Sequence, residues 1–240
     1  MRRMLLVCTA ALLLCPSAGW AQTFFYTQYR TAQGLPANEV RAVTRDTLGF
    51  LWIATDNGLA RHDGRSFTNY QAKLESRYVK DLHRRPDGDL LLANDAGVFA
   101  VTPRTDTATV QRLVGARPRP TDSTVVYPNG VYWDSAGQVW ISQPNGAVVR
   151  WADGGLRTFA FGDDHATGAS DSDFSFAEDA QGQLWLAART GQLYRYAREA
   201  DRFERVQLPR PPDRVHDLRV QDDTLWVVGD RLVRAQIAAD

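Results

Sequence analysis

The segment GFLWIATDNGLARHDG, Gly49 to Gly64, carries the pattern that decides the fold of this 240-residue chain. An apolar run centred on Trp52 is followed by turn residues, a second apolar run and an Asp-Gly pair. An Asp-x-x-Gly turn beginning at Asp46 precedes the tryptophan. In such turns the Asp side chain accepts hydrogen bonds from the following backbone, and Gly tolerates a positive φ. The segment therefore predicts short strands joined by tight turns.

The same pattern returns four more times along the chain, so it is one unit of a repeat. Alignment on the tryptophan places these anchors in register: Trp52, Leu91, Trp140, Trp185 and Trp226. They are separated by 39, 49, 45 and 41 residues. A constant core with variable spacing indicates a structural repeat whose loops differ in length. The predicted turn residues are Asp46, Gly49, Gly88, Asp134, Gly137, Asp179 and Gly182.

Each unit contains four short apolar or alternating runs separated by Gly, Asp or Pro, which is typical of one blade of a β-propeller. We therefore predict an all-β propeller of about five four-stranded antiparallel blades over residues 22–240. The expected units are 35–75, 76–115, 121–162, 170–209 and 213–240. The last unit has only three predicted strands, and residues 24–29 form a surplus strand that could close it. The prediction leaves two arrangements open, a closed five-bladed ring and a partial arc of a larger propeller.

The N-terminus resembles a secretory signal peptide. Two arginines precede an apolar run from Met4 to Cys15, and small residues stand at Gly19 and Ala21. We predict cleavage before Gln22, which places the mature protein in the periplasm or outside the cell. An uncleaved anchor is the alternative, although the run is shorter than an ordinary membrane-spanning helix requires. No second apolar segment follows, so we expect no further membrane span.

Charge and cysteine content exclude several classes of site. The 28 basic and 28 acidic residues balance, which speaks against a nucleic-acid-binding protein. Both cysteines, Cys8 and Cys15, fall within the predicted signal peptide, so the mature chain has neither a disulfide framework nor a Cys-based zinc site. We expect no cofactor and no metal.

The repeat resembles the two-component regulator propeller family. The resemblance rests on GLPxNxV from Gly34, on DxxGFLWIAT from Asp46 and on NGLxRxDGxxF from Asn57. It is strongest in the first unit; the second lacks the Trp, and Asp223 replaces the turn glycine of the fifth. The family implies the periplasmic sensor region of hybrid two-component systems and related histidine kinases, whose typical ligands are glycan fragments. The sequence itself contains no kinase motif.

The repeated residues favour structural roles. The Asp-x-x-Gly carboxylates are hard oxygen ligands of the kind that calcium prefers, but each turn supplies too few of them, and recurrence at blade period favours hairpin turns. The tryptophans could offer a platform for carbohydrate stacking. Their place between apolar neighbours in successive units favours packing between blades instead. We therefore predict that the anchor positions form the repeat core.

Residues that break the repeat are the better ligand candidates. Tyr127, Tyr132, Trp133, Asp163 and His165 stand at or near the blade-specific segments 116–127 and 162–173. The histidines at 62, 83, 165 and 216 show no close metal-ligand spacing. A propeller brings equivalent positions together at its centre, so convergence there remains open.

The sequence favours an exported, non-enzymatic sensor module that binds an oligosaccharide or a partner protein. The partner could be another propeller chain or the remaining domains of a sensor kinase. No catalytic motif such as G-x-S-x-G appears, and the acidic residues are too dispersed to identify a glycosidase pair. Two alternatives stay open: a propeller lyase or hydrolase acting on polysaccharide, and a structural scaffold that pairs with another propeller.

Overall fold

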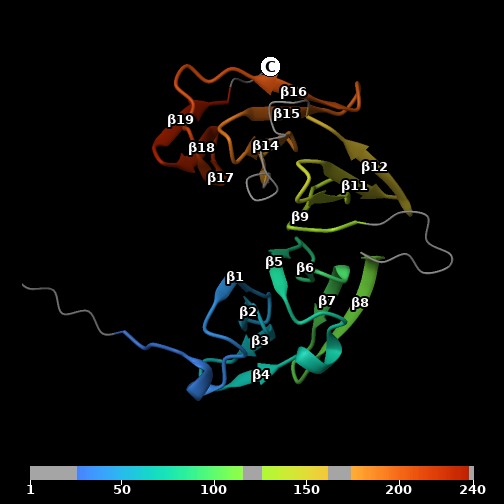
Figure 1. Cartoon of the computed structure of the whole chain (residues 1–240), viewed down its shortest axis with the longest axis vertical. Helices are drawn as coiled ribbons and strands as arrows, with labels where there is room; N and C mark the ends of the chain where they lie inside the picture. Colours follow the sequence, from blue (N-terminus) through green and yellow to red (C-terminus); the bar gives the residue numbers. More distant parts are fainter. Residues whose placement is uncertain (1–25, 116–125, 162–173, 238–240) are drawn as a thin grey trace, which may run out of the picture.

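The computed structural model describes residues 26–115, 126–161 and 174–237. The predicted signal peptide, residues 1–21, lies outside them, as do Asp163 and His165. The described chain is almost entirely β-structure, with short 3-10 turns at Thr31–Gln33 and Gln71–Lys73. Five sheets are placed in turn around a centre (Figure 1), which confirms the predicted five-bladed β-propeller. No helix in the described ranges is long and apolar enough to cross a membrane.

Each sheet is an antiparallel meander in chain order, and we number the blades 1 to 5 accordingly. Blade 1 contains β1 (Val40–Arg45), β2 (Leu51–Thr55), β3 (Gly58–His62) and β4 (Phe67–Asn69). Blade 2 contains β5 (Val79–Arg84), β6 (Leu90–Asn94), β7 (Gly97–Pro103) and β8 (Ala108–Gly115). Blade 3 contains β9 (Gly130–Trp133), β10 (Val139–Ser142), β11 (Val148–Ala152) and β12 (Gly155–Phe159). Blade 4 contains β13 (Phe174–Glu178), β14 (Leu184–Ala188), β15 (Leu193–Ala197) and β16 (Arg202–Val206).

Blade 5 has three strands in the described part of the chain: β17 (Val215–Gln221), β18 (Thr224–Gly229) and β19 (Leu232–Gln236). Residues 26–29, the described part of the surplus segment 24–29, form no strand. Tyr29 instead packs beside blade 1, with its ring 5.0 Å from that of His62 and 5.4 Å from that of Phe67. The outer edge of β19 therefore has no partner strand among the described residues.

One carboxylate joins the turn to the tryptophan in three blades. In blade 1, Asp46 Oδ1 accepts the Phe50 amide at 2.9 Å and Oδ2 accepts Trp52 Nε1 at 2.7 Å. Gly49 adopts the positive φ of 94° that this turn requires. Asp134 with Trp140 and Asp179 with Trp185 make the same two bonds. The motif is therefore a hydrogen-bonded unit that fixes the indole ring in its strand.

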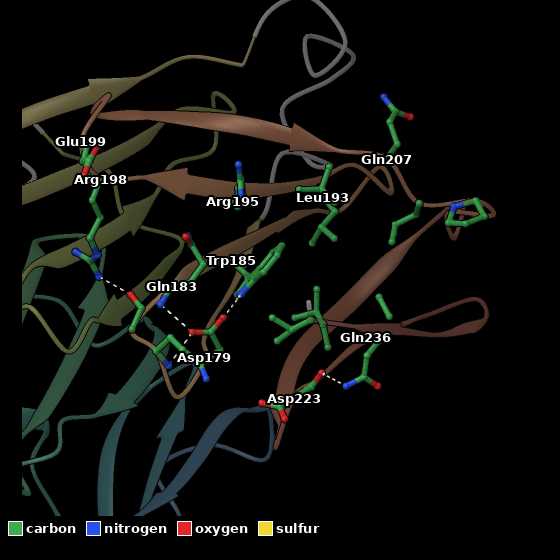
Figure 2. A pocket seen from close by; sticks show the side chains of 18 residues that line it. Asp179, Gln183, Trp185, Leu193, Arg195, Arg198, Glu199, Gln207, Asp223 and Gln236 are labelled. Carbon is green, nitrogen blue, oxygen red and sulfur yellow. Dashed lines mark hydrogen bonds between the residues drawn. The ribbon is translucent and has the colours of Figure 1, made fainter. Parts of the chain in front are cut away.

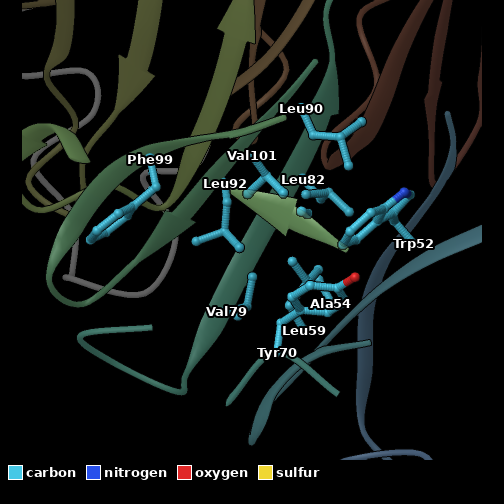
Figure 3. Packing of buried hydrophobic residues seen from close by; sticks show 11 residues of the cluster. Trp52, Ala54, Leu59, Tyr70, Val79, Leu82, Leu90, Leu92, Phe99 and Val101 are labelled. Atoms are coloured by element: carbon cyan, nitrogen blue, oxygen red, sulfur yellow. The ribbon is translucent and has the colours of Figure 1, made fainter. Parts of the chain in front are cut away.

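The anchor residues pack between neighbouring blades. Trp52 is fully buried in a cluster between blades 1 and 2, together with Leu59 and Tyr70 of blade 1 and Leu90 and Leu92 of blade 2 (Figure 3). Equivalent clusters join blades 2 and 3, 3 and 4, and 4 and 5. No such cluster joins blade 5 to blade 1 within the described ranges. The core is thus a series of four interfaces between five sheets.

Candidate functional site

A cleft of about 770 Å³ lies between blades 4 and 5, toward the outside of the ring. Figure 2 shows Trp185 and Leu193 on the blade 4 side, and Asp223 and Gln236 on the blade 5 side. Further apolar lining comes from Val206, Leu208, Leu225, Ala235 and Ile237. The cleft therefore has mixed walls, in which charged and amide side chains alternate with apolar ones, and β19 supplies part of them.

The position of the cleft is explained by the three-stranded fifth blade. In the interface between blades 3 and 4, Trp140 is fully buried and lies 5.5 Å from Phe203, which belongs to the fourth strand β16. Trp185 holds the same position in blade 4, yet it is only partly buried because the facing blade has no fourth strand among the described residues. The cleft is the space that such a strand would fill, so we do not assign it to a small ligand.

The second cavity, about 620 Å³, lies where the first strands of all five blades meet. This volume is within the range of small-molecule sites. Its walls come from β1, β5, β9, β13 and β17, and they carry these polar or aromatic residues: Arg41, Thr44, Asp81, His83, Arg84, Tyr132, Phe174, Ser175, Phe176, His216, Asp217 and Arg219. We call it the central cavity.

A single register position supplies much of this wall. Thr44, His83, Tyr132 and Arg219 each pair across the strands with the anchor of their own blade. Because cross-strand partners share a face of the sheet, these side chains recur at equivalent places around the ring. Ala177 of blade 4 holds the fifth such position. The repeat thus places one side chain at the same position in each blade, and the chemical type of that side chain differs from blade to blade.

Two acidic residues of the cavity wall are tied to the backbone. Asp81 accepts the amides of Leu82 at 2.7 Å and of Val131, in the next blade, at 2.9 Å. Asp217 accepts the Leu218 amide at 2.9 Å. Both stand beside shifts in strand register of the kind that β-bulges cause. Bulges redirect side chains and are enriched near functional sites.

Three aromatic rings line one side of the cavity. The Tyr132 ring lies 4.5 Å from that of His83 and stacks on that of Phe176 at 5.8 Å. Burial lowers the pKa of His83 to about 4, and the positive charge of Arg219 adds to this. Burial, with Glu178 and Asp134 nearby, raises the pKa of Tyr132 above its usual value. Both groups are therefore uncharged at neutral pH.

The arginines of the cavity differ in their partners. Arg41 is paired with Asp56 at 2.5 Å, and Arg219 with Asp217 at 2.7 Å. Arg84 is exposed, and within the described part of the chain no carboxylate pairs with it. Its guanidinium can therefore donate hydrogen bonds to an anionic or hydroxyl-rich molecule at little cost in broken contacts. In the same ranges, no three His, Cys, Asp or Glu side chains gather as a metal-binding group.

The structure places the predicted ligand residues at different sites. Tyr132 lines the central cavity. Trp133 does not, because its ring lies under the Arg85 guanidinium at 3.8 Å and packs against the interface between blades 2 and 3. Tyr127 is exposed on the surface, and its amide donates to Gln143 at 3.2 Å.

Four cavity residues, His83, Arg84, His216 and Arg219, were not among the candidates. Their position in the repeat could have identified them, because all four stand in the first strand of a repeat unit, the strand that faces the centre.

Comparison with known proteins supports the assignment of the repeat. The family model described as a two component regulator propeller matches residues 34–57. No curated protein matches the sequence.

Among solved structures, the extracellular domain of a protein from B. thetaiotaomicron assigned as a hybrid two component system is similar, with a TM-score of 0.63 and 18% identity. The match covers 85% of this chain and 29% of that one.

Two enzymes share the same architecture. Virginiamycin B lyase from Staphylococcus aureus matches with a TM-score of 0.60 and 16% identity, over 85% of this chain and 72% of the lyase. A gluconolactonase from Xanthomonas campestris matches with a TM-score of 0.54 and 15% identity, over 81% of this chain and 70% of that chain. At such identities the likeness establishes the propeller fold alone.

Proposed function

Because the chain carries a two component regulator propeller repeat in a five-bladed propeller, we propose that it is an exported, non-enzymatic sensor module. The central cavity would bind a glycan-like ligand. One observation supports this most strongly: five blades contribute to a single polar cavity, which combines an aromatic wall with the guanidinium of Arg84, which pairs with no carboxylate of the described residues. The exposed wall of this cavity is predominantly polar, so a ligand would be held mainly by hydrogen bonds and charge, as a hydroxyl-rich oligosaccharide can be.

The wall chemistry favours an acidic sugar unit. Tyr132 and Phe176 offer ring surface against which the C–H groups of a pyranose can pack. Arg84 can donate two parallel hydrogen bonds to a carboxylate or sulfate. His83 and Ser175 provide neutral polar groups for hydroxyls. We therefore propose an oligosaccharide that contains a uronic acid or a sulfated sugar.

Binding would act on the packing between blades. A ligand that touches Arg84 of blade 2 and His216 of blade 5 would bridge strands that are separated in sequence and joined only through the ring. It would therefore favour one spacing of the blades over another. A ligand shifts such an equilibrium only by its difference in affinity for the two arrangements. A signalling partner that contacts the propeller would respond to the resulting change in blade arrangement.

An enzymatic role is the second candidate, since two of the similar structures are enzymes. The cavity of this chain favours binding over catalysis. General acid–base catalysis works best with a group whose pKa is near the working pH, whereas the pKa of His83 is lowered to about 4. A neutral, weakly basic imidazole can accept a hydrogen bond but is a poor proton acceptor at pH 7.

The test is calorimetric titration of the mature protein with neutral, uronate-containing and sulfated oligosaccharides, with chromatography of the same mixtures. We expect saturable binding of an acidic oligosaccharide without product. Arg84→Met should raise Kd at least about tenfold, since a hydrogen bond to a charged group contributes about 1.5–3 kcal/mol. Arg65→Met, at an exposed turn of blade 1, is the matched control and should change Kd less than about twofold. Product formation would contradict the sensor proposal, and loss of binding in the control would contradict the site.

A further inference from the structure

Every blade has two faces, and among the described residues only the two faces at the ends of the series lack a partner. We call the face that packs on the next blade the forward face and the opposite one the backward face. In the interface between blades 1 and 2, the forward face presents Trp52, Ala54 and Leu59. The backward face of blade 2 presents Leu82, Leu90 and Leu92. The other three interfaces repeat this arrangement with residues at the same register positions.

The forward face of blade 5 has no partner sheet within the described residues. Val228 and its cross-strand partner Leu232 are 36% and 62% exposed. In the four other blades the residues paired in the same register are at most 2% exposed: Ala54 with Leu59, Ala93 with Val98, Ser142 with Val148, and Ala187 with Leu193. Trp226, the anchor of this blade, is also only partly buried.

The backward face of blade 1 is exposed at two of its positions, whereas Ile53 between them is buried. Leu51 is 41% exposed, whereas its counterparts are at most 1% exposed: Leu90, Val139, Leu184 and Leu225. Val43 is 57% exposed, whereas its counterparts in blades 2, 3 and 5 are at most 6% exposed: Leu82, Val131 and Leu218. Large aliphatic side chains that are exposed to solvent at positions that are buried in the other blades indicate an interaction surface.

The two exposed faces are complementary halves of one interface. The forward face of blade 5 lacks a backward face to pack on, and the backward face of blade 1 lacks a forward face. We propose that the forward face of blade 5 binds the backward face of blade 1 of a second copy of this chain. The occupant is a second copy because each molecule presents both halves in the register that its own four interfaces use.

Charge at the rim supports the same partner. In two internal interfaces, an arginine opposite the anchor reaches the outer turn of the next blade. Arg61 donates to the carbonyl of Arg104 at 2.6 Å, and Arg150 donates to Asp201 at 2.8 Å. Arg234 holds the same position in blade 5, opposite Trp226, and is exposed. The corresponding outer turn of blade 1 contains Asp63, an exposed carboxylate that Arg234 of another copy would meet.

Such an interface is head to tail. Each copy uses a different face toward each neighbour, so the contacts either close into a ring or continue as an open chain. Val43 also lines the central cavity, so the second copy would complete a wall of that cavity as well. The surface itself does not depend on the proposed ligand, and its test requires none.

The head-to-tail geometry allows a specific experiment. Sedimentation velocity of the mature protein from about 1 to about 100 µM should show concentration-dependent association. Leu232→Asp blocks the forward face of blade 5, and Leu51→Asp blocks the backward face of blade 1. Each variant alone should be monomeric. Their equimolar mixture should form one-to-one dimers and nothing larger, since one intact face of each kind remains.

Leu48→Asp is the matched control, because Leu48 is 51% exposed in the β1–β2 turn, outside the strand positions that form either face. It should associate like the wild type. Far-UV circular dichroism and thermal melting establish that all variants are folded. A wild type that stays monomeric over the whole range of protein concentration would overturn the proposal. The exposed faces would then either pack on each other within one molecule or bind a different protein. Dimers of either variant alone, or a mixture that stays monomeric, would overturn the head-to-tail arrangement.

Discussion

The buried carboxylate of blade 3 offers the sharpest test of how the repeat is held together. Asp134 is fully buried and accepts Trp140 Nε1 at 2.9 Å and the Gln138 amide at 2.8 Å. It also lies 3.3 Å from the Arg198 guanidinium, whose side chain is about one-third exposed. Asp134→Ala removes all three contacts and leaves the indole N–H without its acceptor.

The expected loss follows from the environment of each contact. A buried donor left without a partner costs about 1–3 kcal/mol. The turn amide is only partly buried and can reach water, so it adds about 1 kcal/mol. The contribution of the Arg198 pair is small, because solvent screens it. We therefore expect Asp134→Ala to lower the free energy of unfolding by about 2–4 kcal/mol.

Chemical denaturation followed by far-UV circular dichroism measures this loss. A double-mutant cycle with Trp140→Phe separates the indole bond, because phenylalanine keeps the ring packing and has no N–H to satisfy. In that background Asp134→Ala should cost about 1–3 kcal/mol less. Asp213→Ala, which removes a highly exposed carboxylate paired only at the surface, should change stability by less than about 0.5 kcal/mol. A loss below about 1 kcal/mol for Asp134→Ala, or strict additivity with Trp140→Phe, would refute the reasoning.

Two further predictions concern pH and backbone conformation. Because the folded pKa of His83 is lowered from 6.5 to about 4, its contribution is fully present above pH 6.5 and is lost as the pH falls toward 4. His83→Gln should therefore flatten the pH dependence of unfolding in that window, by up to about 3 kcal/mol; an unchanged slope would mean that the imidazole is not buried as described. Gly191→Ala should destabilise the fold by at least about 2 kcal/mol, because its φ is 94° and a Cβ would collide with the Pro212 carbonyl. Gly64→Ala, with a φ of 95° and open space around it, should cost only about 1 kcal/mol in the same melting experiment, and equal losses would contradict the collision.

The fold could be predicted from sequence because its signals are local. A turn such as Asp46 to Gly49 and the apolar strand that follows need only neighbouring residues, and repetition multiplies a weak signal. The same locality explains what was harder to see. Blade 2 has Arg85 and Leu91 in place of the Asp–Trp pair, and the Arg85 guanidinium, paired with Asp87 of its own turn, packs on Trp133 of the next blade. That contact depends on two units together, which made Trp133 look like a ligand candidate.

The central cavity was only partly predictable for a related reason. Tyr132 stood out because it breaks the repeat, whereas His83 and Arg219 resemble ordinary strand residues. Their shared register opposite the anchors becomes visible only when the first strands are superposed as inner strands. Ring closure is harder still to predict from the sequence, since it depends on whether the backward face of blade 1 and the forward face of blade 5 meet in space.

The series of four interfaces has a consequence for how the molecule unfolds. In a closed ring every blade would have two neighbours, but in the described part of a single molecule blades 1 and 5 have one each while blades 2 to 4 have two. Stability in such a linear array is a sum over units and nearest neighbours, so opening starts at the ends. Backbone amides of β10 and β11 should accordingly exchange most slowly with solvent, and those of the edge strands β4 and β19 fastest. Local unfolding would therefore begin in blades 1 and 5, so these terminal blades would be the first to respond to a change in conditions.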